Sequence, residues 1–296
     1  MFTKDGTAQG VAKQRLVESL ASPKTRIIYD PYAERFILGA SIMKVLGHRL
    51  NLWLTHKLIP GFHEHIISRT RFIDDLVEEC SRAGVEQYVI LGAGYDARAH
   101  RLTLEPTLKI FEVDQPEVQN KKRSKLTQDT PNLDNVTYVS IDFNHQTIAE
   151  SLIAAGFDQS KSTVFTLEGV SQYIEKEALA LTIKELSALT QKGGGTFFMS
   201  YVDVALNNDP KTCFGRGYVN PRKKAKVIQA LSARVGEPWI SLYTSEEING
   251  LLSQNDFSVT QHKTLAELNS VYFTPVGRTI PENHILKLEN FVVAQR

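Results

Sequence analysis

Five short apolar runs, separated by polar stretches that can form helices, restrict the fold of this chain more than any other feature. The runs span residues 87–91, 109–114, 136–142, 162–168 and 195–202. The first is followed by Gly92-Ala93-Gly94, and the next three end in an acidic residue. Strands that alternate with helices are joined by right-handed crossovers and form a mostly parallel sheet. The pattern therefore predicts a doubly wound, Rossmann-like α/β fold.

The two ends of the chain extend this arrangement. Before the first run, helical spacing predicts helices over 7–20 and 63–83, and Asp30-Pro31 predicts the start of another between them. The last two apolar runs, 257–263 and 291–294, predict a terminal antiparallel hairpin with no clear helix between them, which gives seven strands in total. We expect residues 1–84 to form a helical cap or lid and residues 85–296 to form the α/β domain, with a charged, proline-containing insertion at 207–238.

Composition excludes several classes of function. The 34 basic and 33 acidic residues nearly balance, so the chain has no field to hold a polyanion, and nucleic acid is not an expected partner. Cys80 and Cys213 lie far apart without a CxxC spacing, which predicts neither a disulfide nor a zinc site and fits a reducing cytoplasm. The apolar stretch 36–67 is interrupted by charged residues, so no membrane span is expected. The oligomeric state is not predicted.

Ligands of doubly wound sheets bind at the carboxyl ends of the strands. Gly92 and Gly94 let the backbone turn sharply and approach a ligand closely. Asp114 follows Gly94 by 20 residues at the end of the second run, where its carboxylate can accept both hydroxyls of a ribose. Asp142 ends the third run, where it can bind the exocyclic amine of adenine, and Phe143 can pack on the purine face. These positions predict a nucleoside cofactor.

The glycine loop alone leaves other functions open. Gly92–Ala97 also satisfies the GxGxxA fingerprint of dinucleotide-binding domains, so an NAD(P)-dependent oxidoreductase is an alternative, as is a nucleoside-binding module without catalysis. Asp114 and Asp142 could also be plain helix N-caps. The acid at position 142 and the long helical segment before the first strand favour a cofactor other than NAD.

Several motifs follow one another along the chain: Gly6–Ala8, Asp30–Glu34, Arg69–Asp75, Gln87–Leu102 (QYVILGAGYDARAHRL), Phe111–Leu126 (FEVDQPEVQNKKRSKL), Thr163–Ile174 (TVFTLEGVSQYI) and Glu237–Trp239. Taken in this order, they resemble the leucine carboxyl methyltransferase family, and in particular its bacterial branch of S-adenosylmethionine-dependent methyltransferases. They span nearly the whole chain, so the resemblance is much more specific than the glycine loop alone.

The resemblance implies a class I methyltransferase fold, S-adenosylmethionine as cofactor and a small-molecule methyl acceptor. It implies that Arg69 binds the methionine carboxylate of the cofactor and that Glu168 lies near its amino group. The other implied cofactor-binding residues are Gly92, Ala93, Gly94, Asp114, Asp142 and Phe143. Tyr173 is implied at the mouth of the site, so Tyr173 and Glu168 are the candidate catalytic residues. The apolar N-terminal helices suggest a partly apolar acceptor that is methylated on oxygen.

Simpler structural explanations are expected for other groups. His63 and His65 are two residues apart, which puts them on different helix faces with no third ligand near, so we expect solvated or capping histidines and no metal. The basic run 121–125 is expected to be the solvent-exposed face of a helix. The basic stretch 216–226 is expected to be a solvated insertion. Trp53 is expected in a helix–helix core. For Arg69, a surface ion pair with Asp74 or Asp75 is the alternative.

Overall fold

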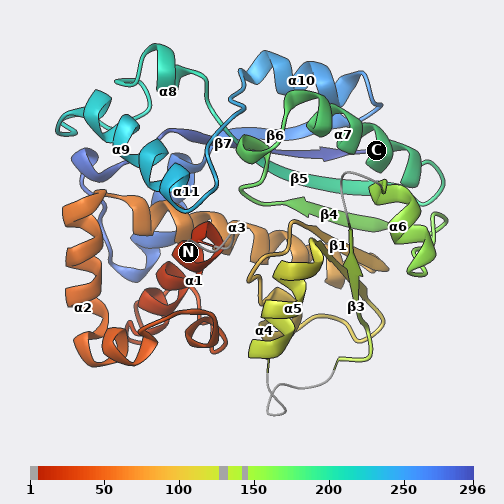
Figure 1. Ribbon diagram of the computed structural model, residues 1–296, viewed down its shortest axis with the longest axis horizontal. Helices are drawn as coiled ribbons and strands as arrows, with labels where there is room; N and C mark the ends of the chain where they lie inside the picture. Colours follow the sequence, from red (N-terminus) through yellow and green to blue (C-terminus); the bar gives the residue numbers. More distant parts are fainter. Residues whose placement is uncertain (1–5, 127–132, 142–145) are drawn as a thin grey trace. The chain divides into compact units, whose positions relative to one another are not determined.

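The computed structural model describes residues 6–126, 133–141 and 146–296 (Figure 1). By contacts the chain divides into two compact units. One, here called the helical unit, contains 1–73, 202–239 and 263–290; the other, the sheet unit, contains 74–201, 240–262 and 291–296. The helical unit therefore joins the N-terminal helices to the segment that contains the expected insertion, and its first boundary lies within a helix. The role of these N-terminal helices as a lid stays a prediction.

The described residues form a seven-stranded sheet in the order β3-β2-β1-β4-β5-β7-β6. Its strands are β1 (Gln87–Leu91), β2 (Lys109–Asp114), β3 (Val136–Ser140), β4 (Thr163–Leu167), β5 (Gly195–Val202), β6 (Ser258–Thr264) and β7 (Glu289–Gln295). The first five pair in parallel, and Leu91 lies beside both Val113 and Leu167. The strands therefore end together at one edge, and the predicted fold class is confirmed.

The terminal hairpin is also confirmed, although the connection within it is more regular than expected. Backbone hydrogen bonds join Gly195 to Arg296 and Asp203 to Leu288, so β7 runs antiparallel to β5. The expectation of no clear helix between the last two strands is wrong, because α11 (Leu268–Phe273) forms there. Thr264 and Glu267 make a capping box just before it, and this local hydrogen bonding makes up for the weak apolar periodicity.

Helices cover both faces of the sheet. On one face, α6 (Ile148–Ala154), α7 (Lys176–Leu189) and α10 (Ser245–Ser253) pack on alternate strand residues (Figure 1). This core cluster includes Val89, Leu91, Phe111, Val113, Phe165, Leu167, Leu152, Ile183 and Ile248. Residues of opposite parity, such as Tyr88 and Glu112, point to the other face, as the period of two in a strand requires. α5 (Pro116–Lys125) packs there.

Lys122 of α5 corrects one expectation. The basic run 121–125 is not uniformly exposed to solvent, because Lys122 is 1% exposed. Its ammonium donates to Glu112 Oε2 at 2.6 Å in the middle of β2. Burial raises the pKa of Glu112, and the nearby Lys122 charge acts against this rise. A buried cation needs such a partner, and the partner lies ten positions away on a different element.

The helical unit begins with α1 (Gly6–Ser19), a short 3₁₀ helix η1 (Ala33–Phe36), α2 (Ala40–Leu58) and α3 (Phe62–Arg82). Asp30-Pro31 does not open the second α-helix as expected. Asp30 Oδ1 instead accepts from the backbone N–H groups of Tyr32 and Ala33 in the turn before η1, and its Oδ2 accepts from Arg15 at 2.7 Å. The carboxylate is thus used in a buried ion pair and a tight turn.

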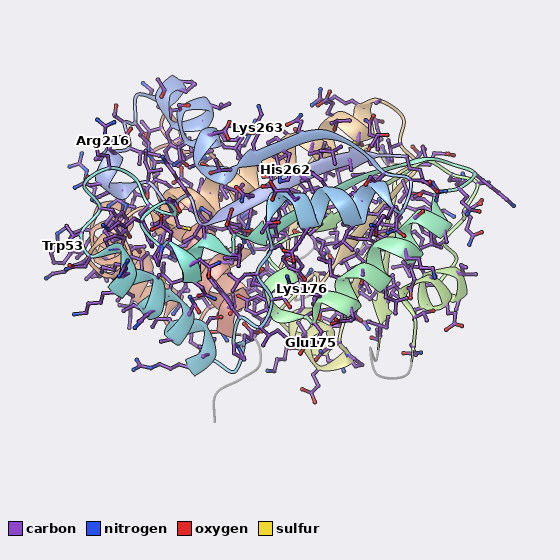
Figure 2. All side chains as sticks on the ribbon, turned by 90° about the horizontal axis from the view of Figure 1, so that it is seen from above. Trp53, Glu175, Lys176, Arg216, His262 and Lys263 are labelled. Carbon is purple, nitrogen blue, oxygen red and sulfur yellow. The ribbon has the colours of Figure 1, made fainter. Side chains whose placement is uncertain are left out.

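Helix α2 is unusually exposed. Within α2, whose residues are all described, the only buried residue is Asn51. The helix is broken at Gly47 (φ 70°, ψ 175°), where Asn51 Nδ2 donates to the carbonyls of Met43 and Gly47, each at 2.7 Å. Trp53 is 53% exposed, so its expected place in a helix–helix core is wrong (Figure 2).

The segment 207–238 is also partly regular. α9 (Pro221–Arg234) covers much of the basic stretch that was expected to be a solvated insertion, with Pro221 in its first turn. The Tyr218 hydroxyl donates to the carbonyl of Pro60 at 3.0 Å. Cys80 and Cys213 are both buried and free. Among the described helices, none is both long and apolar enough to cross a membrane.

Candidate cofactor site at the strand ends

The loop after β1 adopts the conformation that its glycines predict. Gly92 and Gly94 have φ values of 66° and 47°, in the left-handed region where other residues are strained. The N–H groups of Gly92 and Ala93 both donate to the carbonyl of Val113, at 2.9 and 3.1 Å. The loop is therefore fixed against the end of β2, and its backbone is held at the strand ends.

Asp114 closes this arrangement from the β2 side. Its Oδ2 accepts from the Gly94 N–H at 2.6 Å, and its Oδ1 accepts from the Gln115 N–H at 2.7 Å. Each carboxylate oxygen has a second lone-pair site, so both can still accept from a ligand hydroxyl. Burial raises the pKa of Asp114, while the two N–H groups act in the opposite direction. The predicted ribose acid is thus rigidly placed beside the glycine loop.

Glu168 follows β4 and is held by an arginine that the sequence analysis missed. Its Oε2 accepts from Arg98 Nη1 at 2.7 Å. The same guanidinium, on the short helix α4 (Arg98–Arg101), also contacts Asp96 and donates to Asp74 at 2.8 Å. Arg98 is buried; burial alone would lower its pKa, but the surrounding carboxylates raise it above its ordinary value.

The signal for this cluster was present in the sequence. Asp96 and Arg98 lie directly after the glycine loop, and Asp74 belongs to the Arg69–Asp75 motif. Analysis of the glycine spacing alone did not connect them, because Arg98 and Glu168 are 70 residues apart. The fold brings their side chains together at the ends of β1 and β4.

The turn after β4 fits closely against the glycine loop. Gly169 has φ 62°, and its N–H donates to the Ser200 hydroxyl at 3.0 Å. Tyr173, in the short helix η2 (Ser171–Tyr173), follows half-buried. A Cβ placed on Gly92 would lie 2.6 Å from Cγ2 of Val170, so the two loops touch where the methionine part of the cofactor is predicted.

We expect Gly92→Ala to lower cofactor affinity by about tenfold or more. The added methyl collides with Val170, and the positive φ strains any residue other than glycine, at a cost of roughly 1–3 kcal/mol. Calorimetric titration with S-adenosylhomocysteine measures the change. Gly84→Ala, also at positive φ but with no atom within 4 Å of an added Cβ, is the control and should leave affinity unchanged. Equal affinities for both variants would contradict the close fit.

Two other groups of predicted residues remain untested. Arg69 lies on α3 in the helical unit, where Nη1 donates to Glu289 at 2.8 and 3.0 Å. It is 5% exposed, so the alternative of a surface residue is wrong. Its role on the cofactor carboxylate stays a prediction. Asp142 and Phe143, predicted to hold the adenine, lie outside the described residues.

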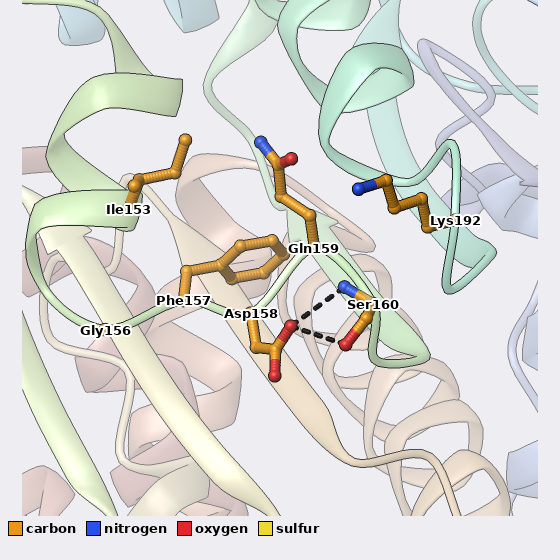
Figure 3. A pocket seen from close by; sticks show the side chains of 7 residues that line it. All are labelled: Ile153, Gly156, Phe157, Asp158, Gln159, Ser160 and Lys192. Carbon is orange, nitrogen blue, oxygen red and sulfur yellow. Dashed lines mark hydrogen bonds between the residues drawn. The ribbon is translucent and has the colours of Figure 1, made fainter.

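A separate pocket lies at the opposite end of the strands. It measures about 410 Å³, and Figure 3 shows it beside the residues that precede β4 and β5. Its lining residues are Ile153, Gly156, Phe157, Asp158, Gln159, Ser160 and Lys192. Ligands of this fold class bind at the carboxyl ends, so this pocket at the amino ends is not the candidate cofactor site.

Comparison with known proteins agrees with the geometry. Residues 8–187 match the family model described as leucine carboxyl methyltransferase. Two relatives, each named "Putative S-adenosyl-L-methionine-dependent methyltransferase", come from Mycobacteroides abscessus and Mycobacterium marinum. They are 36% and 33% identical, over 63% and 69% of this chain. The matches span 60% and 69% of those relatives' own lengths.

A solved structure shares the fold over most of its length. A DUF574-family protein from Streptomyces avermitilis superposes with a TM-score of 0.60 at 14% identity, covering 96% of this chain and 97% of the other. The family match extends over more than half of the chain and includes the glycine loop, Asp114, Arg98 and Glu168. The chain belongs to the leucine carboxyl methyltransferase family of S-adenosylmethionine-dependent methyltransferases.

Proposed function

We propose that this protein transfers a methyl group from S-adenosylmethionine to an oxygen of a small, partly apolar acceptor, most readily a carboxylate, by direct in-line transfer. The observation that supports this proposal above all is the Asp114 carboxylate, which is fixed 2.6 Å from the Gly94 N–H at the strand ends. The names of the relatives also indicate methyl transfer and give no support to a nicotinamide oxidoreductase.

The described residues fit the cofactor. Val170 of the turn after β4 lies where a Cβ on Gly92 would be, so glycine is the residue that lets the two loops meet beside the predicted cofactor. Asp114 would accept hydrogen bonds from the ribose hydroxyls. The Glu168 carboxylate, oriented by Arg98, would accept one from the amino group of the methionine part. When bound, the cofactor supplies an activated, electrophilic methyl group.

The chain's own task is to orient the acceptor and exclude water. Alignment of the two reacting atoms alone can supply a large part of the barrier reduction. A carboxylate acceptor is already ionised at neutral pH, so it needs no general base. A hydroxyl acceptor needs a group that takes its proton, and Tyr173 and Glu168 are the candidates. Several large apolar side chains of α2, including Trp53 and Leu54, are exposed, and this is the feature that favours a partly apolar acceptor.

Radiolabelled methyl transfer to a mixed library of apolar carboxylic acids and phenols tests the proposal. We expect mild alkali to release the label from the products as methanol, because methyl esters hydrolyse under these conditions whereas methyl ethers do not. Tyr173→Phe should leave ester formation near the wild-type rate, but should slow any phenol methylation by roughly 100-fold or more. Label on nitrogen or carbon alone would overturn the proposal. Tight S-adenosylhomocysteine binding without transfer to any acceptor would favour the nucleoside-binding module.

A further inference from the structure

A cluster of potential metal ligands lies in the helical unit, outside the cofactor site. Glu18 of α1, His48 of α2 and His63 of α3 each offer one ligand atom, and these atoms lie within 4.8 Å of one another. Glu18 and His63 are fully buried. The expectation that His63 is solvated or capping, with no third ligand near, is therefore wrong. His65 is buried as well, with Nε2 2.7 Å from Glu289.

The Glu18 carboxylate is oriented so that one of its oxygens faces His63. Its Oε1 accepts from the Ile27 N–H at 2.6 Å and from Arg278 Nη1 at 2.7 Å. Its Oε2 faces His63 Nε2 at 2.8 Å. The carboxylate is thus held through Oε1 by two donors, and its Oε2 is the oxygen that faces the histidine.

His63 lies between two oxygen atoms. Its Nδ1 is 3.0 Å from Gln14 Oε1, and its Nε2 faces Glu18 Oε2. A neutral imidazole has one N–H and can donate to only one of these acceptors. With the hydrogen on Nδ1, which donates to Gln14, Nε2 has a lone pair that can bind a cation. Metal-binding histidines ordinarily donate their other N–H to an oxygen in this way.

His48 completes the set. Its Nε2 is buried and has no hydrogen-bond partner among the described residues. The nitrogen of a neutral imidazole that has no hydrogen offers a lone pair, and this buried Nε2 is placed to do so. The residue follows the break at Gly47, and its ring lies edge-on to that of His63, with centroids 6.2 Å apart. Burying a nitrogen without a hydrogen-bond partner costs free energy, so the position of His48 Nε2 needs a physical explanation.

We propose that Glu18, His48 and His63 form a binding site for a divalent transition metal, with Zn²⁺ as the best-suited ion. Two imidazole nitrogens and one carboxylate oxygen are a donor set that zinc prefers, with water as the fourth ligand. Each ligand comes from a different helix, and α2 has little other buried surface. The ion would clamp α2 to α1 and α3, and the inference does not depend on the methyl acceptor.

Zinc titration of the full-length protein tests this site. Protein stripped with a chelator and dialysed is titrated with ZnCl₂ by calorimetry, and thermal unfolding is followed in parallel. We expect one zinc ion per chain and a melting temperature raised by about 5 °C at a zinc concentration one hundred times Kd. Cobalt in place of zinc should give the visible absorption of a four-coordinate ion.

Variants separate a metal site from a plain polar network. His48→Ala removes a partly exposed side chain whose Nε2 has no partner, so the fold should survive while zinc affinity falls more than about 100-fold. Gln14→Ala should lower it roughly 10- to 100-fold. His262→Ala, in the sheet unit, is the matched control and should bind zinc like the wild type (Figure 2). No stoichiometric zinc on the wild type, or equal affinity in His48→Ala, would overturn the proposal.

Discussion

Asp114→Ala is expected to abolish measurable cofactor binding, with affinity for S-adenosylhomocysteine reduced at least about 100-fold. A hydrogen bond to a charged group contributes roughly 1.5–3 kcal/mol, and the carboxylate is expected to accept two from the ribose. Calorimetry measures the loss. Adenosine should lose affinity by a similar factor, since both ligands contain the same sugar. Wild-type affinity in the variant would remove the ribose assignment.

Asp114→Asn is the matched control for the carboxylate charge. The amide keeps the size and one acceptor oxygen, so we expect an intermediate loss of about tenfold. The pH dependence gives a second test. Burial raises the pKa of Asp114 above the ordinary aspartate value of about 3.9. As the pH falls through this raised pKa, the carboxylate takes a proton and the wild type loses affinity, whereas the asparagine variant should not respond in that range.

Arg98→Met is expected to destabilise the protein by about 3–5 kcal/mol and to weaken cofactor binding. The substitution removes the buried guanidinium that pairs with Asp96 and Glu168, and breaking a buried ion pair by removing one partner is strongly destabilising. Asp74 keeps its contact with Arg101. Urea unfolding measures the first effect. Titration with S-adenosylhomocysteine and with methylthioadenosine, which lacks the amino-acid group, measures the second.

The comparison with methylthioadenosine distinguishes a positioning role of Arg98 from a general loss of folding. If Arg98 acts by orienting Glu168 toward the cofactor's amino group, affinity for S-adenosylhomocysteine should fall much more than affinity for methylthioadenosine. Arg98→Met combined with Glu168→Gln removes a charge together with its partner, so part of the stability should return. Equal losses for both ligands, or no recovery in the double variant, would mean that Arg98 serves the fold alone.

The strand ends could be predicted because their signals are local. The glycine spacing, the acid that closes β2 and the acid after β4 each lie next to an apolar run, and strand polarity alone gathers them at one edge. Strands β1, β2 and β5 were likewise predicted at the bounds that the structure has. Periodicity of apolar residues depends on neighbours within one or two turns, so a single sequence contains it.

The partners of buried polar groups could not be predicted in this way. Arg98 finds Glu168 70 residues away, and His65 reaches Glu289 across 224. Lys122 was predicted to be one of several exposed charges in a basic run, whereas in the structure it is buried and paired with Glu112 of β2. Nothing local shows which distant residue each of them contacts, because the same side-chain types also occupy ordinary exposed surfaces.

The sequence alone therefore determined the α/β architecture, the edge of the sheet where the cofactor is predicted and the family to which the chain belongs. Only the tertiary structure decided which charges are buried, which carboxylates surround Arg98 and that Glu18, His48 and His63 converge. The physical reason is the range of the forces involved. Secondary structure follows from backbone geometry and near neighbours, whereas the burial of a charge is tolerated only where a distant segment brings its partner.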